Sequence, residues 1–335
     1  MKRGLHPIFS SVGIGALAGF ASAALYVGSA TGSPLGLLLS FFTVLPHFVA
    51  GLGWGLPAAV TACVVSSAGL ALSGNADVGG IFFLTIAAPA ALLCHLSLLA
   101  RPSELPETGG PVDPDKREWY PAGRLALWLA ALAVIIFFAL EAFVSGFDGG
   151  LRGTVVHALN ELAPDDGDLR RTLMANFPGL KWDQVVHMIA TMVPAAAGIS
   201  WQLMMVCNGL LAETILTASH RALRPSFAPG ALTLPRPYTA LMGLALVLAL
   251  MGGQIGFMGG TVAAYLYVPY FFLGLTVVHA IPVRGAGRAL MLALFYFLIL
   301  VMGRLAIAVG LLGLVEQWTG LRARFEAAKA AREDK

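Results

Sequence analysis

The sequence predicts an all-α protein: a polytopic transmembrane helical bundle with eight full spans and a ninth that is broken into two short halves. Hydrophobic residues make up 58% of the 335 residues and charged residues only 12%, against roughly 25% charged residues in soluble domains. The apolar residues also gather in runs close to the roughly 20 residues that a helix needs to cross a bilayer. The mean hydropathy of +0.79 agrees, and these observations exclude both a soluble globule and a disordered chain.

Nine apolar runs are the candidate spans. They are apolar throughout, whereas the strands of an outer-membrane barrel would alternate with period two, so helices are favoured. Turn-forming residues separate the runs. We expect one membrane-embedded domain over residues 1–315, followed by a charged tail over 316–335. The candidate spans are Ile8–Ala30, Leu35–Ala50, Leu56–Leu72, Val78–Ala100, Gly123–Val144, Val185–Thr217, Tyr238–Met251, Thr261–Ile281 and Ala289–Val315.

The first run carries small residues at every fourth position, at Gly15, Gly19 and Ala23. This spacing lets a second helix approach closely. The second helix belongs either to this chain or to a separate subunit. Because the run is longer than the apolar part of a signal peptide, about 7–15 residues, we interpret it as a retained helix.

Basic residues predict the orientation of the chain. With a cytoplasmic N-terminus, most lysines and arginines outside the spans fall on the cytoplasmic side, including those of a loop over 101–122. The long loop over 145–182 then lies on the opposite side. Within it Leu151, Val155 and Leu159 repeat at helical spacing, which predicts an amphipathic helix on the membrane surface.

The ninth run breaks this parity. The basic tail after Val315 belongs with the other cytoplasmic charges, but a single crossing would place it on the opposite side. The run is long, and Arg304 lies in its middle. We expect two short halves that enter and return, with the turn near Gly303 and Arg304. The alternative is one tilted span with the tail outside.

The sixth run carries a polar stripe from His187 to Glu213, whose members step by three or four residues and share one helix face. Pro194 removes one backbone hydrogen bond and permits a kink. Because lipid cannot satisfy polar groups, the stripe predicts either a cavity for a small polar solute or interhelical hydrogen bonds that only hold the bundle together. Ionisable residues inside other runs are also candidates. The predicted ligand-binding residues are His187, Thr191, Gln202, Asn208, Glu213, Arg304 and His47.

Enzyme motifs are missing from the sequence. It has no P-loop, no HExxH and no GxSxG pattern. Cys63, Cys94 and Cys207 lie inside apolar runs without a CxxC pair, which argues against a disulfide framework or a zinc site. No basic cluster is interleaved with aromatic residues as on a nucleic-acid surface. We therefore expect a non-enzymatic protein with the lipid bilayer as its partner, and no catalytic residue, cofactor, metal or nucleic acid.

Four segments carry a resemblance to a known family: Leu45–Gly55, Asn208–Glu213 running into two arginines, Val268–Ala280 and Leu312–Trp318. Together they resemble the YybS-like family of bacterial multi-pass membrane proteins over most of the chain. That family is similar, more remotely, to the substrate-binding S components of energy-coupling-factor vitamin transporters and to the cell-shape protein MreD. S components are shorter and have six spans.

The resemblance implies a helical bundle in the bacterial cytoplasmic membrane with a solute pocket between spans. It also implies that Gly15, Gly19 and Ala23 form a face on which a transmembrane coupling subunit docks. The expected function is the binding or transport of a small solute. The alternatives are a membrane scaffold without a ligand and a membrane enzyme acting on a lipid-linked substrate.

Overall fold

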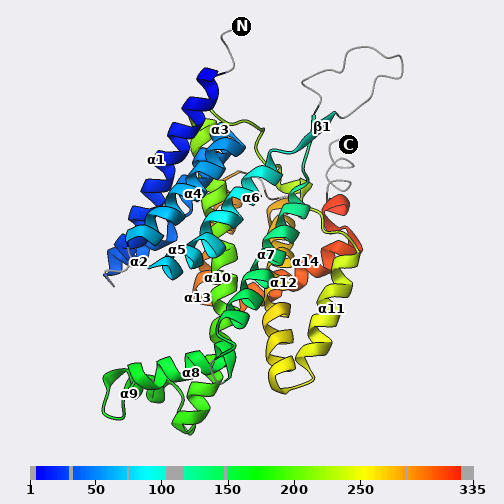
Figure 1. Ribbon diagram of the computed structural model, residues 1–335. Helices are drawn as coiled ribbons and strands as arrows, with labels where there is room; N and C mark the ends of the chain where they lie inside the picture. The colour runs from blue at the N-terminus through cyan, green and yellow to red at the C-terminus, as the bar shows by residue number, and fades with distance from the viewer. Residues whose placement is uncertain are drawn as a thin grey trace. The chain divides into compact units, whose positions relative to one another are not determined.

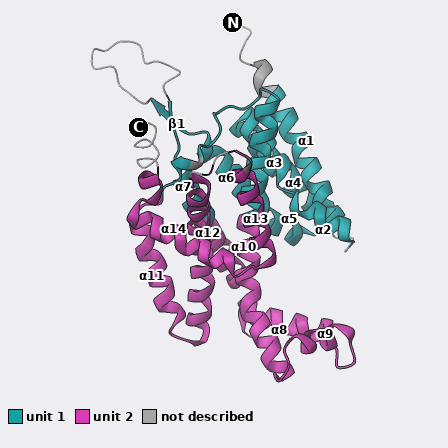
Figure 2. Cartoon of the chain, turned by 180° about the vertical axis from the view of Figure 1, so that it is seen from behind, with its two compact units in different colours: residues 1–129, 203–233 teal, residues 130–202, 234–335 magenta. Residues whose placement is uncertain are grey.

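The structure, a computed structural model, describes residues 5–29, 33–73, 75–102, 117–146, 149–281, 283 and 285–325. The chain divides into two compact units (Figure 2). Unit 1 is drawn from residues 1–129 and 203–233, and unit 2 from residues 130–202 and 234–335. Each unit is described by itself below.

Unit 1 consists almost entirely of helices that are apolar and closely packed. Helix α1 packs along α4 and α3 (Figure 1). Its elements are α1 (Leu5–Ser29), α2 (Pro34–Phe41), α3 (Leu45–Trp54), α4 (Leu56–Ser73), α5 (Ala76–Phe82), the π-helix η1 (Phe83–Ala87), α6 (Ala88–Ser97), β1 (Ala100–Pro102), β2 (Arg117–Trp119), the first part of α7 (Ala122–Phe143), the last part of α10 (Trp182–Ala218) and the 3₁₀ turn η2 (Pro229–Ala231).

Unit 2 is built around α12, which packs against α11 and α14. A Cβ atom on Gly274 of α12 would clash with the carbonyl of Val309 in α14, so only glycine allows this approach. A second core cluster joins Ala133 and Phe137 of α7 to Phe257 and Tyr265 of α12. The remaining elements of this unit are the last part of α7, α8 (Gly150–Leu162), α9 (Asp168–Asn176), the first part of α10, α11 (Pro237–Ala249), α12 (Gly253–Ala280), α13 (Ala286–Val301) and α14 (Leu305–Thr319).

Seven helices among the described residues are long and apolar enough to cross a membrane, counting α2 with α3 and α5 with α6 as one span each. The bent pair α13 and α14 adds an eighth candidate. The chain is therefore an integral membrane protein with several spans, and the predicted all-α class is confirmed. The exact number of spans and their orientation stay predictions.

The seventh predicted span, Tyr238–Met251, is present with nearly those bounds as α11, a helix shorter than a full span needs. Helix α11 has 13 residues, or about 20 Å of rise, against a hydrocarbon core of about 30 Å. It ends before Gly252 and Gly253, which have φ angles of 73° and 57°. These positive φ values favour glycine in the turn between α11 and α12, which begins at Gly253.

The ninth run is broken where the sequence predicts. Helices α13 and α14 meet at an angle of 120°, with Met302, Gly303 and Arg304 between them. Helix α14 then packs on α12, where a Cβ atom on Gly313 would clash with the carbonyl of Tyr270. The break is confirmed, whereas the side of the membrane that each half faces stays a prediction.

The two long loops both contain secondary structure. Strands β1 and β2 pair antiparallel, with Arg101 opposite Glu118, an element that the sequence analysis did not foresee. The predicted amphipathic helix within 145–182 is present as α8, and no described residue of it is buried. Its place on the membrane surface stays a prediction. Of the predicted charged tail, residues 326–335 lie outside the described residues.

Candidate functional site

The second span is interrupted in its middle. Phe42, Thr43 and Val44 form a turn between α2 and α3 inside the apolar span Pro34–Trp54. Pro46 explains the interruption, because proline has no N–H to donate to an earlier carbonyl and is tolerated in the first turn of a helix, where it lies in α3. The predicted span Leu35–Ala50 is therefore two helices and not one continuous helix.

The turn frees two backbone carbonyls at membrane depth. In a continuous helix the Leu45 N–H would bond the Phe41 carbonyl, but it bonds the carbonyl of Phe42 instead, at 3.0 Å. The His47 N–H likewise bonds the carbonyl of Val44, at 3.1 Å, and leaves that of Thr43. Lipid cannot satisfy such groups, so other parts of the protein must.

Side chains from two other helices satisfy these carbonyls. The side-chain amide of Asn208, on α10, donates to the Phe41 carbonyl at 2.8 Å and to the carbonyl of Met204 at 2.8 Å. The hydroxyl of Ser22, on α1, donates to the Thr43 carbonyl at 2.6 Å. Both donors are fully buried. The break is therefore held from two sides by uncharged polar groups.

His47 lies one turn beyond the break and faces α4. Its Nε2 atom is 3.1 Å from the hydroxyl oxygen of Ser66, and that hydroxyl is 2.8 Å from the carbonyl of Ala62. The hydroxyl has a single hydrogen, which the carbonyl accepts, so His47 Nε2 is the donor to Ser66. This hydrogen bonding assigns the proton to Nε2 and leaves Nδ1 as an acceptor.

Aromatic and thiol groups surround the imidazole. The ring of Phe82 lies 6.1 Å from that of His47, and the ring of Tyr26 packs edge-on against Phe82 at 5.1 Å. The thiol of Cys94 lies 3.9 Å from the His47 carbonyl oxygen. The π-helix η1 begins directly after Phe82. Such π-helical segments occur often at functional sites.

We call Ser22, Thr43, His47, Ser66 and Asn208 the polar cluster. All five side chains are buried, with exposed fractions of 2% or less. Three of their polar atoms have no hydrogen-bond partner among the described residues, namely Thr43 Oγ1, His47 Nδ1 and Asn208 Oδ1. Leaving such an atom unsatisfied costs about 1–3 kcal/mol. The cluster can therefore offer acceptors to a small molecule that donates hydrogen bonds.

The predicted stripe on α10 does not face inward along its whole length. His187 and Thr191 are exposed, which corrects that part of the prediction, and the Thr191 hydroxyl only returns to the carbonyl of His187. Val185, Val186 and Ala190 in the same turns are buried, so these two polar side chains lie outside the packed face of the helix. Gln202 is fully buried, and its amide donates to the carbonyl of Tyr265 at 3.4 Å.

Pro194 and Gly198 of α10 also lie against Tyr265 of α12. The hydroxyl of Tyr265 donates to the Pro194 carbonyl at 2.7 Å. A Cβ atom at Gly198 would overlap the Tyr265 ring. In unit 2 this part of the stripe therefore holds α10 against α12 by hydrogen bonds, one of the two roles that the sequence left open.

Glu213 lies where α10 meets the following loop. Its Oε1 atom accepts from the backbone N–H of Phe227 at 2.9 Å. In that loop Arg224 donates to the Ser97 carbonyl at 2.9 Å and lies over the Phe227 ring. Burial lowers the pKa of the Arg224 guanidinium, and the charge of Glu213 opposes this shift. Glu213 thus anchors a loop.

The remaining predicted residues are separate from the polar cluster or support it. Arg304 is exposed at the break between α13 and α14. Gly15 and Gly19 face α4: a Cβ atom at Gly15 would lie 2.5 Å from the Ala58 carbonyl oxygen, and one at Gly19 would lie 2.8 Å from that of Ala62. Ala23 is half-buried. A coupling subunit would have to displace α4 to dock on the two glycines.

Sequence reasoning identified His47 and Asn208 but missed Ser22, Thr43 and Ser66. Serine and threonine are common in membrane helices and give no signal alone. Pro46 in the middle of an apolar run is the signal that could have located the break. Among the described residues, no group of three or more His, Cys, Asp or Glu side chains is placed to hold a metal ion.

Comparisons with known proteins identify no relative. No family model, curated protein or solved structure matches the chain.

Proposed function

We propose that this integral membrane protein binds a small, uncharged polar solute at the polar cluster and serves in its passage across or within the membrane. One observation supports the proposal above all: Thr43, His47 and Asn208, which lie in, flank or bond a helix break in the middle of an apolar span, each carry a buried polar atom without a partner among the described residues. Broken membrane helices commonly form the substrate sites of transporters, and polar groups inside spans mark function. The resemblance to S components implies the same role.

The chemistry of the polar cluster indicates the class of solute. None of its five residues is an acid or a permanent cation, so no charged partner is matched there. The Nδ1 atom of His47 and the Oδ1 atom of Asn208 are acceptors, and the Thr43 hydroxyl both donates and accepts. A solute rich in N–H or O–H donors, such as a polyol, a primary amide or a nucleobase, fits this arrangement.

Thr43→Val tests the proposal without disturbing the fold. The substitution keeps the shape of the side chain and removes only a hydroxyl that has no partner among the described residues. We expect native mass spectrometry of the purified wild type to show a bound solute, or polyols, amides and nucleobases to raise its unfolding temperature, and Thr43→Val to lose both effects. Thr61→Val on α4, whose hydroxyl bonds only its own helix, is the matched control.

The second candidate function is a membrane scaffold without a ligand. It is favoured by the observation that Ser22 and Asn208 already satisfy the two carbonyls of the break. If the protein is a scaffold, Thr43→Val removes an unsatisfied buried hydroxyl and should raise the free energy of unfolding in the absence of any solute. If solutes raise the unfolding temperature equally in the wild type and in Thr43→Val, the scaffold function is supported.

The positive-inside rule supports a cytoplasmic N-terminus in a bacterial cytoplasmic membrane. Asp183→Cys and Ser226→Cys test this orientation, since the rule places position 183 outside and position 226 inside. A membrane-impermeant maleimide should label position 183 in intact cells, and position 226 only after the cells are opened. The reverse pattern would overturn the orientation but not the solute site.

A further inference from the structure

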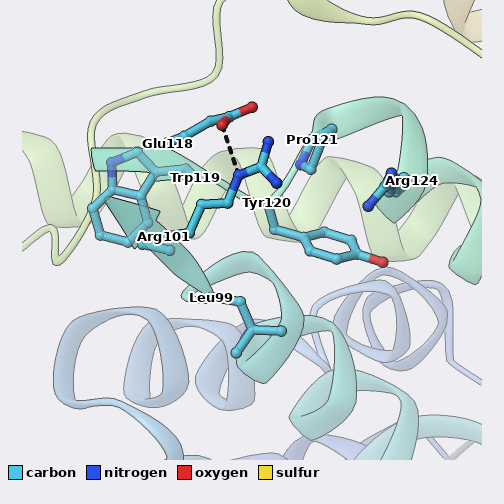
Figure 3. Close-up of a pocket in the computed structure, with 8 residues that line it drawn as sticks. Leu99, Arg101, Glu118, Trp119, Tyr120, Pro121 and Arg124 are labelled. Carbon is cyan, nitrogen blue, oxygen red and sulfur yellow. Dashed lines mark hydrogen bonds and ion pairs between the residues drawn. The ribbon is translucent and has the colours of Figure 1, made fainter. Parts of the chain in front are cut away.

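A pocket of unit 1 lies where two spans leave the apolar layer. The chain passes from α6, which ends at Ser97, into β1, and from β2 into α7, which begins at Ala122. The pairing of the two strands closes a pocket of about 260 Å³ between these helix ends, lined by Leu99, Arg101, Glu118, Trp119, Tyr120 and Arg124 (Figure 3). We call it the interfacial pocket.

The interfacial pocket has a net positive charge. Two arginines and one carboxylate line it, and Arg101 Nε donates to Glu118 at 2.7 Å (Figure 3). The adjacent Arg101 guanidinium lowers the pKa of the Glu118 carboxyl, so this group is ionised at neutral pH. Arginine has five donors, so Arg101 keeps donors for a second acceptor after bonding Glu118.

The pocket is lined by the aromatic residue types that are typical of membrane interfaces. Tyr120 accepts a hydrogen bond from the indole N–H of Trp128 at 3.1 Å, and the ring of Trp119 lies 5.7 Å from the Arg224 guanidinium. Tryptophan and tyrosine concentrate at the level of lipid headgroups. Leu99 adds an exposed apolar side chain at the same place. The pocket thus combines cations, hydroxyl and indole groups with apolar surface at one depth.

We propose that the interfacial pocket binds the headgroup of an anionic phospholipid, with Arg101 and Arg124 on its phosphate. A single phosphodiester charge matches the one positive charge that remains after Glu118 is counted. The Glu118 carboxylate can in turn accept a hydrogen bond from a hydroxyl of the headgroup, which favours phosphatidylglycerol over lipids without hydroxyls. Clusters of arginine next to spans recognise anionic lipids in this way. The proposal is independent of the solute site.

Lipid titrations of the full-length protein in detergent test the proposal. We expect phosphatidylglycerol, but not phosphatidylcholine, to bind by native mass spectrometry and to raise the unfolding temperature. Arg124→Gln should weaken phosphatidylglycerol binding about fivefold, the effect of about one arginine near an anionic lipid surface, and Arg124→Lys should retain most of the binding. Arg171→Gln, which removes an exposed arginine of α9, is the matched control.

Three results would overturn the proposal. Equal binding of phosphatidylcholine would show that the pocket does not recognise the negative charge of the headgroup. Equal binding by wild type and Arg124→Gln would place the lipid elsewhere. Stabilisation by free glycerol phosphate as strong as that by phosphatidylglycerol would assign the pocket to a soluble phosphate compound instead of a lipid.

Discussion

Within the described residues, two apolar runs contain a helix break, and the breaks differ in what surrounds them. The break between α2 and α3 is buried, and side chains of Ser22 and Asn208 bond the carbonyls that it frees. The break between α13 and α14 is exposed, and Met302, Gly303 and Arg304 face outward. An interrupted helix is therefore part of a candidate binding site in one place and only a bend in the other. The difference lies in whether neighbouring helices supply polar side chains to the break.

The largest effect is expected where α1 meets α4, because this contact places Ser22 at the buried break. Gly19→Leu adds a side chain whose Cβ atom would lie 2.8 Å from the Ala62 carbonyl oxygen. We expect a loss of about 3 kcal/mol in the free energy of unfolding, the upper end of the usual cost of overpacking. Unfolding in mixed detergent and SDS, followed by tryptophan fluorescence, measures it.

Gly13→Leu is the control for this prediction. It makes the same change two turns earlier on α1, where a Cβ atom has no neighbour within 4 Å. Its unfolding free energy should match that of the wild type. If both variants lose the same stability, the close α1–α4 contact is not what supports the break.

The next effect concerns the buried break itself. Asn208→Leu removes the donor to the Phe41 carbonyl and leaves that carbonyl unsatisfied in an apolar interior. We expect a loss of about 1–3 kcal/mol in the same unfolding measurement. Thr191→Ala on the same helix removes an exposed hydroxyl that bonds only its own helix, and it should change the stability by less than about 0.5 kcal/mol. Equal losses in the two variants would contradict the role of Asn208.

A smaller effect is expected at the proline of α10. Tyr265→Phe removes the hydroxyl that donates to the Pro194 carbonyl, and we expect a loss of about 1 kcal/mol, the net value of a typical hydrogen bond. Tyr26→Phe in unit 1 is the control, because its ring contact with Phe82 survives the change. A Tyr265→Phe variant as stable as the wild type would show that the Pro194 carbonyl in unit 2 needs no side-chain donor, unlike the carbonyls at the break in unit 1.

The smallest effect is expected at the exposed break. Gly303 has no neighbour within 4 Å of a Cβ atom and no positive φ angle, so Gly303→Ala should shift the unfolding free energy by less than about 0.5 kcal/mol. Arg304→Gln should do the same in the same assay. A loss above about 1 kcal/mol in either variant would show that this break is also held by specific contacts, and the comparison would fail.

The sequence predicted the class of the fold and the broken ninth run, because both follow from local properties. Apolar runs separated by turn residues identify spans one at a time. Arg304 in the middle of an apolar run was enough to suggest a break, and α13 and α14 meet there. The bounds of α11 were predicted almost to the residue, at Tyr238–Met251, but this run was counted as a full span although it is shorter than a bilayer needs.

The candidate site could be predicted only in part, because it depends on which helices meet. His47 and Asn208 were identified as polar residues in apolar runs, but their roles depend on Ser66 and on the Phe41 carbonyl, which lie far away in sequence. Helical spacing grouped His187 with Gln202, yet one is exposed and the other buried. Helical periodicity predicts which residues share a face of a helix. It does not predict how far along the helix that face stays in contact with a neighbouring helix.

The π-helix η1 has a consequence for how insertions and deletions act on unit 1. The N–H of Ala88 bonds the carbonyl of Phe83, five residues back, so this turn absorbs one more residue than an α-helical turn. Deleting one residue there would restore regular winding while the residues after it keep the faces that they already present. Deleting one residue from a regular α-helical turn would instead rotate every later residue by about 100° around the axis. The turn at Phe83–Ala87 is therefore the place in this span where a one-residue deletion leaves the thiol of Cys94 next to the His47 carbonyl.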